Sequence, residues 1–345
     1  MNGKQRIVSA LNLQPVDRTP VWFMRQAGRH LPEYRKIAAE HSFWERCMDV
    51  DLCTRITLQP LERYQKIDAA IIFSDILTPL PSLGYDVEYG GGIRISEFSL
   101  DDVDDWTKFS ARKHAPWAAD GLKSVGEELG ETTARLGFVG SPWTICMYLL
   151  SGGTGDKDFH NARAKVYSNP EEAQHMLMKM GEIVGDLLAD QVIHGGADAV
   201  QLFDTWAGEL SPSAYRIHVA PHVQRIIWAI QAANGKIIYY LRNGAHLFDT
   251  ALSFGADGYS FDWRVSLPEM AQRLDAGKAP KVAVQGNLDP VLLFAEPETI
   301  RERVQALHAS MNGRPGHVFN LGHGLLPDLP LSGIGAFVDA VKGLG

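Results

Sequence analysis

The sequence has few cysteines and no uninterrupted long apolar run. Its 345 residues include three cysteines, Cys47, Cys53 and Cys146, an odd number without the spacing of a disulfide framework. The longest uncharged run, residues 136–155, is broken by proline, glycines and polar side chains. The N-terminal residues contain no apolar stretch of signal-peptide length. We therefore expect neither a disulfide-built secreted protein nor a membrane protein, but a soluble protein of the reducing cytoplasm.

The chain also has fewer basic than acidic side chains. Lys and Arg together number 33 against 41 Asp and Glu, which gives a formal net charge of −8. Such a chain is a poor candidate for binding nucleic acid or an anionic membrane, and neither is expected as a partner. An anionic small ligand is still compatible with this charge, because salt screens the overall field beyond about 8 Å and leaves local groups in control. The 45% hydrophobic content is enough for a large core.

Several common motifs are missing. The chain has no Walker A sequence, no G-x-G-x-x-G fingerprint and no G-x-S-x-G nucleophile elbow. His218 and His222 are four residues apart but lack the H-E-x-x-H order, and no cysteine lies at ligand spacing from a histidine. The sequence therefore predicts no tightly bound zinc.

Short apolar runs alternate with helical patterns, which is typical of βα units around a parallel sheet. The candidate strands are residues 18–25, 69–75, 135–139, 199–204, 236–241, 258–262, 281–285 and 317–321. Eight strands separated by helices predict a single (β/α)8 TIM barrel over residues 1–345. An amphipathic N-terminal helix precedes it. Residues 84–95 predict a β-hairpin within an insertion between the second and third strands.

Barrel enzymes carry their sites at the carboxyl ends of the strands, so the residues found there are the candidates for chemistry. They are Arg25, Arg29, Asp75, Tyr148, Asp204, Thr205, Arg242, Asp262, Asn287 and His323. Several arginines and acids among apolar residues suit an anionic ligand with a large apolar body. Asp204 and Asp262 also have a structural interpretation, in which they cap loops or pair with Arg242.

Six motifs, in order, give the chain a specific resemblance. They are MRQAGRHLPEYR (24–35), FSDIL (73–77), GSPWT…MYLLSGG (140–153), QLFDTWAGELSP (201–212), QGNLDP (285–290) and NLGHGLLPD (320–328). Together they resemble the uroporphyrinogen decarboxylase family along essentially the whole chain. The resemblance implies a cytoplasmic homodimer of (β/α)8 barrels that acts without cofactor or metal. It also implies conversion of the four acetates of uroporphyrinogen III to methyls, giving coproporphyrinogen III for haem or chlorophyll synthesis.

The resemblance also assigns roles to individual residues. The catalytic candidates are Arg25, Asp75, Tyr148 and His323, all of which would also contact substrate. Further substrate contacts would come from Gln26, Ala27, Gly28, Arg29, Trp44, Phe203 and Thr205. Thr205 stands where the family commonly has serine, Trp44 where phenylalanine is frequent, and His30 where many members have tyrosine. These departures affect substrate contacts and not the reaction.

Two other functions fit the sequence less well. Zinc-dependent methyltransferases of a related fold resemble this chain, but they carry a His-x-Cys pair where residues 240–246 read YLRNGAH. A non-catalytic tetrapyrrole-binding protein would need the arginines but not Asp75. The proton donor of a decarboxylation is left open among Arg25, His323, Tyr148 and a water.

Overall fold

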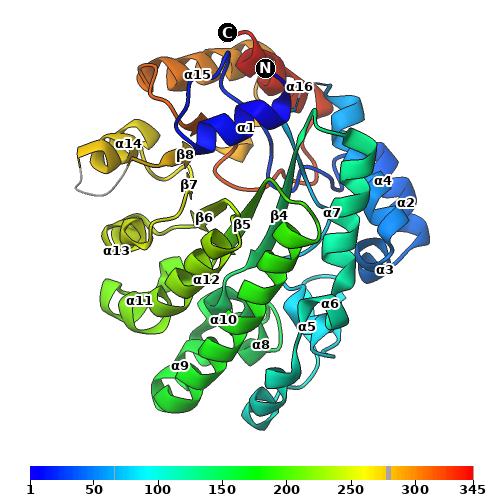
Figure 1. Cartoon of the computed structure of the whole chain (residues 1–345), viewed down its shortest axis with the longest axis vertical. Helices are drawn as coiled ribbons and strands as arrows, with labels where there is room; N and C mark the ends of the chain where they lie inside the picture. Colours follow the sequence, from blue (N-terminus) through cyan, green and yellow to red (C-terminus); the bar gives the residue numbers. More distant parts are fainter. Residues whose placement is uncertain (66, 277–280, 345) are drawn as a thin grey trace.

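A computed structural model describes residues 1–65, 67–276 and 281–344. Its centre is a curled parallel sheet of seven strands in the order β1-β4-β5-β6-β7-β8-β9 (Figure 1). The strands are β1 Ala69–Ile71, β4 Ala134–Gly140, β5 Ala199–Asp204, β6 Ile237–Leu241, β7 Gly258–Phe261, β8 Ala283–Gln285 and β9 His317–Val318. β5 and β6 are buried along their whole length, as expected for strands covered on both faces.

Within the described residues, the predicted first strand, 18–25, forms one β-bridge, between Val21 and Phe319, which directly follows β9. On its other side, the Val21 carbonyl accepts a hydrogen bond from the Asp68 backbone N–H at 2.8 Å. The pairing stops because the next backbone donor is diverted. The Phe23 N–H bonds the Gln26 side chain at 3.1 Å. The prediction of a full strand here was wrong, although the segment does join the sheet.

Sixteen α-helices surround and connect the strands in the described part of the chain. Those along the outside of the sheet include α4 Val50–Arg63, α7 Pro116–Leu129, α10 Pro170–Ile193 and α12 Ala220–Ala232 (Figure 1). The others are α1 Gly3–Leu11, α2 Pro32–Glu40, α3 Phe43–Met48, α5 Pro79–Ser82, α6 Ala111–His114, α8 Pro142–Ser151, α9 His160–Ser168, α11 Pro212–His218, α13 Phe248–Ala251, α14 Leu267–Ala276, α15 Pro297–Ser310 and α16 Leu331–Lys342. No helix of these described segments is long and apolar enough to cross a membrane.

The predicted hairpin is confirmed between β1 and β4. Strand β2 Val87–Tyr89 pairs antiparallel with β3 Ile93–Ile95. The hairpin is fastened to the loop after α8 by an antiparallel bridge between Arg94 and Gly153. A Cβ on Gly153 would lie 1.9 Å from the Ile93 carbonyl oxygen, so only glycine permits this approach. The bridge therefore holds the hairpin beside the C-terminal end of α8, the helix that follows β4.

Candidate functional site

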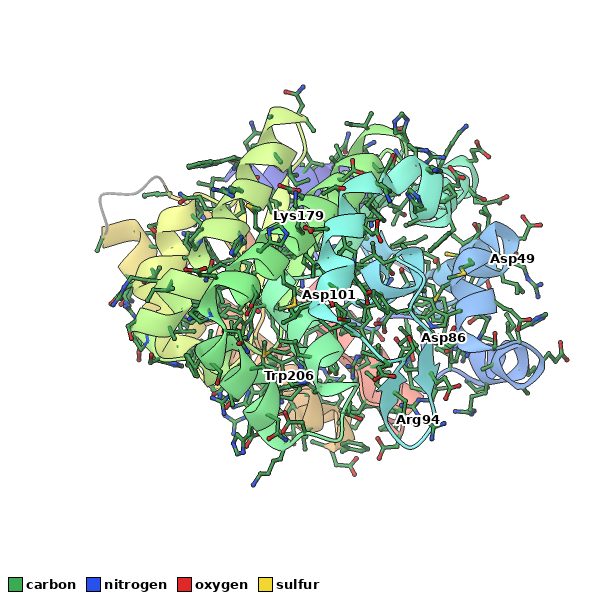
Figure 2. The ribbon with its side chains drawn as sticks, turned by 90° about the horizontal axis from the view of Figure 1, so that it is seen from below. Asp49, Asp86, Arg94, Asp101, Lys179 and Trp206 are labelled. Carbon is green, nitrogen blue, oxygen red and sulfur yellow. The ribbon has the colours of Figure 1, made fainter. Side chains whose placement is uncertain are left out.

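The candidate residues meet where the parallel strands end. Figure 2 views the molecule from this side, with Trp206, which follows β5, and Arg94 of the hairpin both labelled. Loops, helix starts and the hairpin all supply side chains here, because parallel strands place their carboxyl ends at one edge.

Asp75 follows β1 and is half-buried. Its Oδ1 accepts the Leu77 backbone N–H at 2.8 Å, and its carboxylate accepts the Tyr89 hydroxyl from the hairpin. Burial raises the pKa of Asp75 above its ordinary value, while these two donors and the charge of Arg25 oppose the rise. The pKa of Tyr89 is itself raised by burial and by the Asp75 charge, so the phenol keeps its proton and remains a donor.

Arg25 occupies a left-handed backbone conformation, with φ of 55°. Non-glycine residues adopt this region rarely, and strained residues concentrate at functional sites. Its side chain passes over Gly324, where a Cβ would lie 2.5 Å from Arg25 Cδ. The charge of Arg25 acts on Asp75, Tyr148 and His323. The four residues predicted as catalytic therefore form one electrostatically connected cluster, which we call the arginine–aspartate cluster.

Tyr148 lies on α8 and is buried. Its ring packs edge-to-face against Phe159 at 5.1 Å and Trp206 at 6.3 Å between centroids. Burial raises the pKa of Tyr148, and the nearby Asp75 charge raises it further. The hydroxyl is therefore protonated at neutral pH and serves as a hydrogen-bond donor.

His323 is fixed in one neutral form by its neighbour Tyr240. The Tyr240 hydroxyl lies 3.0 Å from the Gly322 carbonyl oxygen and 3.0 Å from His323 Nδ1. Because a carbonyl only accepts, the single phenolic proton goes to Gly322, and Nδ1–H donates to Tyr240. Burial lowers the pKa of His323 to about 3, assisted by the charges of Arg25, Arg242 and Arg264. His323 is thus a neutral imidazole whose Nε2 is an acceptor.

The other predicted substrate contacts have varied surroundings. Gln26 is buried and braces its loop by donating to the Ala69 carbonyl at 3.0 Å. The Trp44 indole donates to the Val87 carbonyl at 2.8 Å and so supports the hairpin. Phe203 packs between the rings of Phe138 and Tyr240, each 5.5 Å away. Thr205 is half-buried after β5, Ala27 and Gly28 are half-buried on the Arg25 loop, and Arg29 is exposed there.

The two other strand-end acids have structural partners. Asp204 accepts the Thr144 hydroxyl at 3.0 Å and the Tyr239 hydroxyl at 2.7 Å. Asp262 bonds the Arg264 guanidinium at 2.9 Å and caps the Asn243 backbone N–H at 2.6 Å. The structural interpretation of both acids is supported, but the partner proposed for them from the sequence, Arg242, is not the one they bind.

Tyr89 and Tyr240 belong to the site but were not among the residues predicted from the sequence. Tyr89 reaches Asp75 only because the hairpin docks across the strand ends. Tyr240 lies inside an apolar strand, where an aromatic residue is ordinary core. A polar hydroxyl near the end of β6 was the one signal available, because a buried phenol needs a hydrogen-bond partner.

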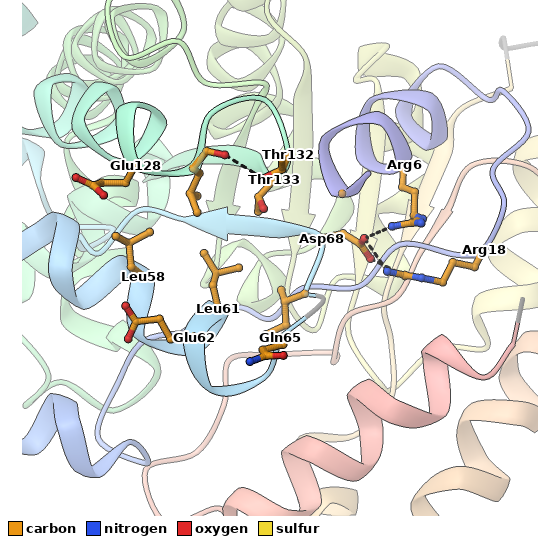
Figure 3. Close-up of a pocket in the computed structure, with 13 residues that line it drawn as sticks. Arg6, Arg18, Leu58, Leu61, Glu62, Gln65, Asp68, Glu128, Thr132 and Thr133 are labelled. Atoms are coloured by element: carbon orange, nitrogen blue, oxygen red, sulfur yellow. Dashed lines mark hydrogen bonds and ion pairs between the residues drawn. The ribbon is translucent and has the colours of Figure 1, made fainter. Parts of the chain in front are cut away.

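A large pocket lies at the opposite end of the sheet (Figure 3). Its volume is about 680 Å³, and Asp68 and Thr133, which line it, come just before β1 and β4. Arg6 and Arg18 line it too, but both bind the buried Asp68 carboxylate, at 3.1 and 2.7 Å. The pocket's arginines are already paired with this acid, so the pocket is a poor anion site.

Across residues 1–65, 67–276 and 281–344, three or more His, Cys, Asp or Glu side chains nowhere gather in a way that could hold a metal ion.

Comparison with known proteins gives consistent results. A family model described as "Uroporphyrinogen decarboxylase (URO-D)" matches residues 2–344. The chain is 39% identical to uroporphyrinogen decarboxylase of Pseudomonas fluorescens (strain Pf0-1), covering 98% of this chain and 96% of that one. It is also 39% identical to the enzyme of that name from Chromohalobacter salexigens, with 98% and 97% covered. Among solved structures, a methyltransferase from Methanosarcina mazei has the same fold, with a TM-score of 0.80, 17% identity and 99% of each chain covered.

Proposed function

The chain belongs to the uroporphyrinogen decarboxylase family, and on that premise we propose that it converts the four acetates of uroporphyrinogen III to methyls, giving coproporphyrinogen III. The observation that carries the proposal is the arginine–aspartate cluster. It combines a fixed carboxylate, Asp75, with a guanidinium, Arg25, at the carboxyl end of the sheet. This is the pair that loss of CO2 from a pyrrole acetate requires.

The reaction needs a place for the electrons of the broken bond. A proton added to a ring carbon makes the pyrrole cationic, and the ring then accepts the electron pair of the C–CO2⁻ bond as CO2 leaves. A second proton adds to the exocyclic methylene carbon, and the ring carbon returns its proton. Each acetate therefore consumes one proton, releases one CO2 and becomes a methyl group.

Asp75 stabilises the cationic ring. A unit charge about 4 Å from the developing cation contributes roughly 4 kcal/mol at an effective dielectric near 20. This corresponds to about a thousandfold in rate. The Leu77 N–H, the Tyr89 hydroxyl and Arg25 favour the ionised carboxylate against the effect of burial. Asp75 is thereby held in place before the substrate arrives.

Arg25 and Arg29 seat the substrate carboxylates, since planar guanidiniums bind carboxylates through paired hydrogen bonds. The depressed pKa of His323 argues against it as the proton donor at neutral pH. Its Nε2 is instead suited to accept a pyrrole N–H. The donors that remain are Arg25, Tyr148 and a water molecule held among them.

The proposal extends to the assembly of the protein. The segment around Val21, which bonds Phe319 on one side and Asp68 on the other, acts as the eighth strand of a single-domain (β/α)8 barrel. The chain forms a homodimer, as the family resemblance implies, and binds no nucleic acid. It acts in the cytoplasm, a location that its three buried free thiols support.

The methyltransferase alternative is weaker, because the 17% identity to a methyltransferase structure reflects the fold alone, against 37–39% identity to several decarboxylases. Anaerobic incubation with uroporphyrinogen III, followed by chromatography of the oxidised products, separates the two. We expect intermediates with seven, six and five carboxylates and then coproporphyrinogen III. Unchanged uroporphyrinogen would refute the proposed function.

A further inference from the structure

Arg242 is a strand-end arginine whose expected partners are occupied by other groups. It follows β6, and Asp204 and Asp262 lie at the ends of the strands on either side. Asp204 is bound by hydroxyl groups, and Asp262 is bound by Arg264. Within the described ranges, Arg242 has no ion pair with any carboxylate. Its positive charge is therefore available to a ligand.

The Arg242 side chain is held in place before any ligand binds. Its guanidinium carbon lies 5.5 Å from the centre of the Trp206 ring, a cation–π arrangement. Its Nε is buried and has no hydrogen-bond partner among the described residues. A buried donor without a partner is unfavourable and calls for an acceptor. A carboxylate would satisfy Nε and a terminal nitrogen together, because these two donors match its two oxygens.

Arg242 faces the arginine–aspartate cluster from the side of β6. Together with Arg25, its charge lowers the pKa values of Tyr148, Tyr240 and His323 relative to burial alone. Arg25 reaches these groups from the loop after Met24, so the two guanidiniums approach from different elements. Arg264 also acts on His323, but its charge is neutralised by Asp262 at 2.9 Å.

We propose that Arg242 is a second carboxylate seat, which binds a propionate of the tetrapyrrole while the Arg25 loop holds the acetate that reacts. This inference rests on the proposed function. The acetates disappear one after another, whereas the propionates remain through all four steps. A seat on a separate strand end can orient the macrocycle in every step only if the carboxylate that it binds is still present in every step. Among the substrate's carboxylates, only the propionates meet this condition.

The test measures kinetics and product binding on the purified full-length chain. Arg242→Ala and Arg242→Lys are compared for kcat and KM with uroporphyrinogen III, and coproporphyrin III binding is titrated by fluorescence. Coproporphyrin III carries propionates and no acetates, so its binding reports on propionate recognition without any contribution from the reacting acetate. We expect Arg242→Ala to raise KM and the coproporphyrin Kd by about tenfold or more, with kcat within about threefold. Arg242→Lys should give intermediate values of KM and of the coproporphyrin Kd, because lysine keeps the positive charge but lacks the paired donors of the guanidinium.

Arg264→Gln is the matched control, since it removes a neighbouring arginine that Asp262 already neutralises. We expect it to leave the coproporphyrin Kd within about twofold of the wild type. Equal effects of the Arg264 and Arg242 changes would overturn the inference, because they would indicate a general loss of positive potential. An unchanged coproporphyrin Kd in folded Arg242→Ala would overturn it too. If the wild type binds coproporphyrin III but does not decarboxylate uroporphyrinogen III, the proposed function is refuted. The coproporphyrin Kd values of the Arg242 variants then still test the carboxylate seat.

Discussion

Gly324→Ala provides a sharp test of how the site is built. A Cβ at residue 324 would lie 2.5 Å from Arg25 Cδ, 2.6 Å from Cγ and 3.1 Å from Cβ. Rotation about χ1 could carry Cγ and Cδ away, but it would take the guanidinium with them, and the close contact with Arg25 Cβ would remain. The Leu325 N–H donates to the Met24 carbonyl at 2.9 Å and ties the two segments together. The added methyl group must therefore displace Arg25.

The size of the effect follows from these distances. Carbon atoms pack at about 3.5–4.0 Å, so Arg25 must shift by about 1 Å. A displacement of this size at a reacting group costs up to about a hundredfold in rate. We expect kcat/KM to fall by about 30–100-fold, or about 2–3 kcal/mol. Overpacking should also lower the free energy of unfolding by about 1–3 kcal/mol.

Steady-state kinetics and thermal unfolding on the same preparation check this expectation. Gly335→Ala in α16 is the control, because a Cβ there meets nothing within 4 Å. It should leave the kinetics unchanged and stabilise the helix by up to about 1 kcal/mol. In a variant that already carries Arg25→Ala, adding Gly324→Ala should cause little further loss of kcat/KM, since the two changes act on one group. Normal kinetics in Gly324→Ala, or full additivity with Arg25→Ala, would refute the reasoning.

Two further predictions concern Tyr89 and Arg29. Tyr89→Phe removes a donor that lowers the pKa of Asp75, so the acidic limb of the kcat profile should move to higher pH. The other groups that face this site, Cys47, Arg25 and Tyr148, are left unchanged by this substitution. Tyr85→Phe, whose hydroxyl contacts Asp102 and Trp106 instead, should leave the profile in place, and equal shifts would contradict the role of Tyr89. Arg29→Lys should fold normally yet lose at least about tenfold in kcat/KM, because the ammonium lacks the guanidinium fork. A slightly lower melting temperature with unchanged kinetics would assign Arg29 a structural role only.

The sequence predicts best where local pattern and burial agree. Strand β5 has the predicted bounds, residues 199–204, because its continuous apolar run is buried on both faces. The sequence pattern over residues 211–235 predicts one helix, but the structure divides it into α11 and α12 near Pro221, whose ring removes a backbone donor. The first strand was predicted to be too long because side-chain acceptors bind its backbone N–H groups. A hydropathy pattern does not show such hydrogen bonds.

The candidate site was predictable in part for a similar reason. Asp75 and His323 follow apolar strands, and parallel strands bring such residues to one edge without further information. Tyr89 and Tyr240 act through contacts between distant segments. Tyr89 depends on the docking of the hairpin against Gly153 and Trp44, and Tyr240 on the loop that carries Gly322. No local pattern encodes such pairings.

The central claim is that the charge of Asp75 stabilises a cationic ring, and Asp75→Asn tests it most directly. The amide keeps the size of the side chain and can still accept the Leu77 N–H, but it loses the charge. The measurement is kcat and KM for uroporphyrinogen III under anaerobic conditions, with thermal unfolding as the control for folding. The account predicts a kcat lower by about a thousandfold, with KM within about threefold of the wild type. Turnover near the wild-type rate in a folded Asp75→Asn variant would contradict it.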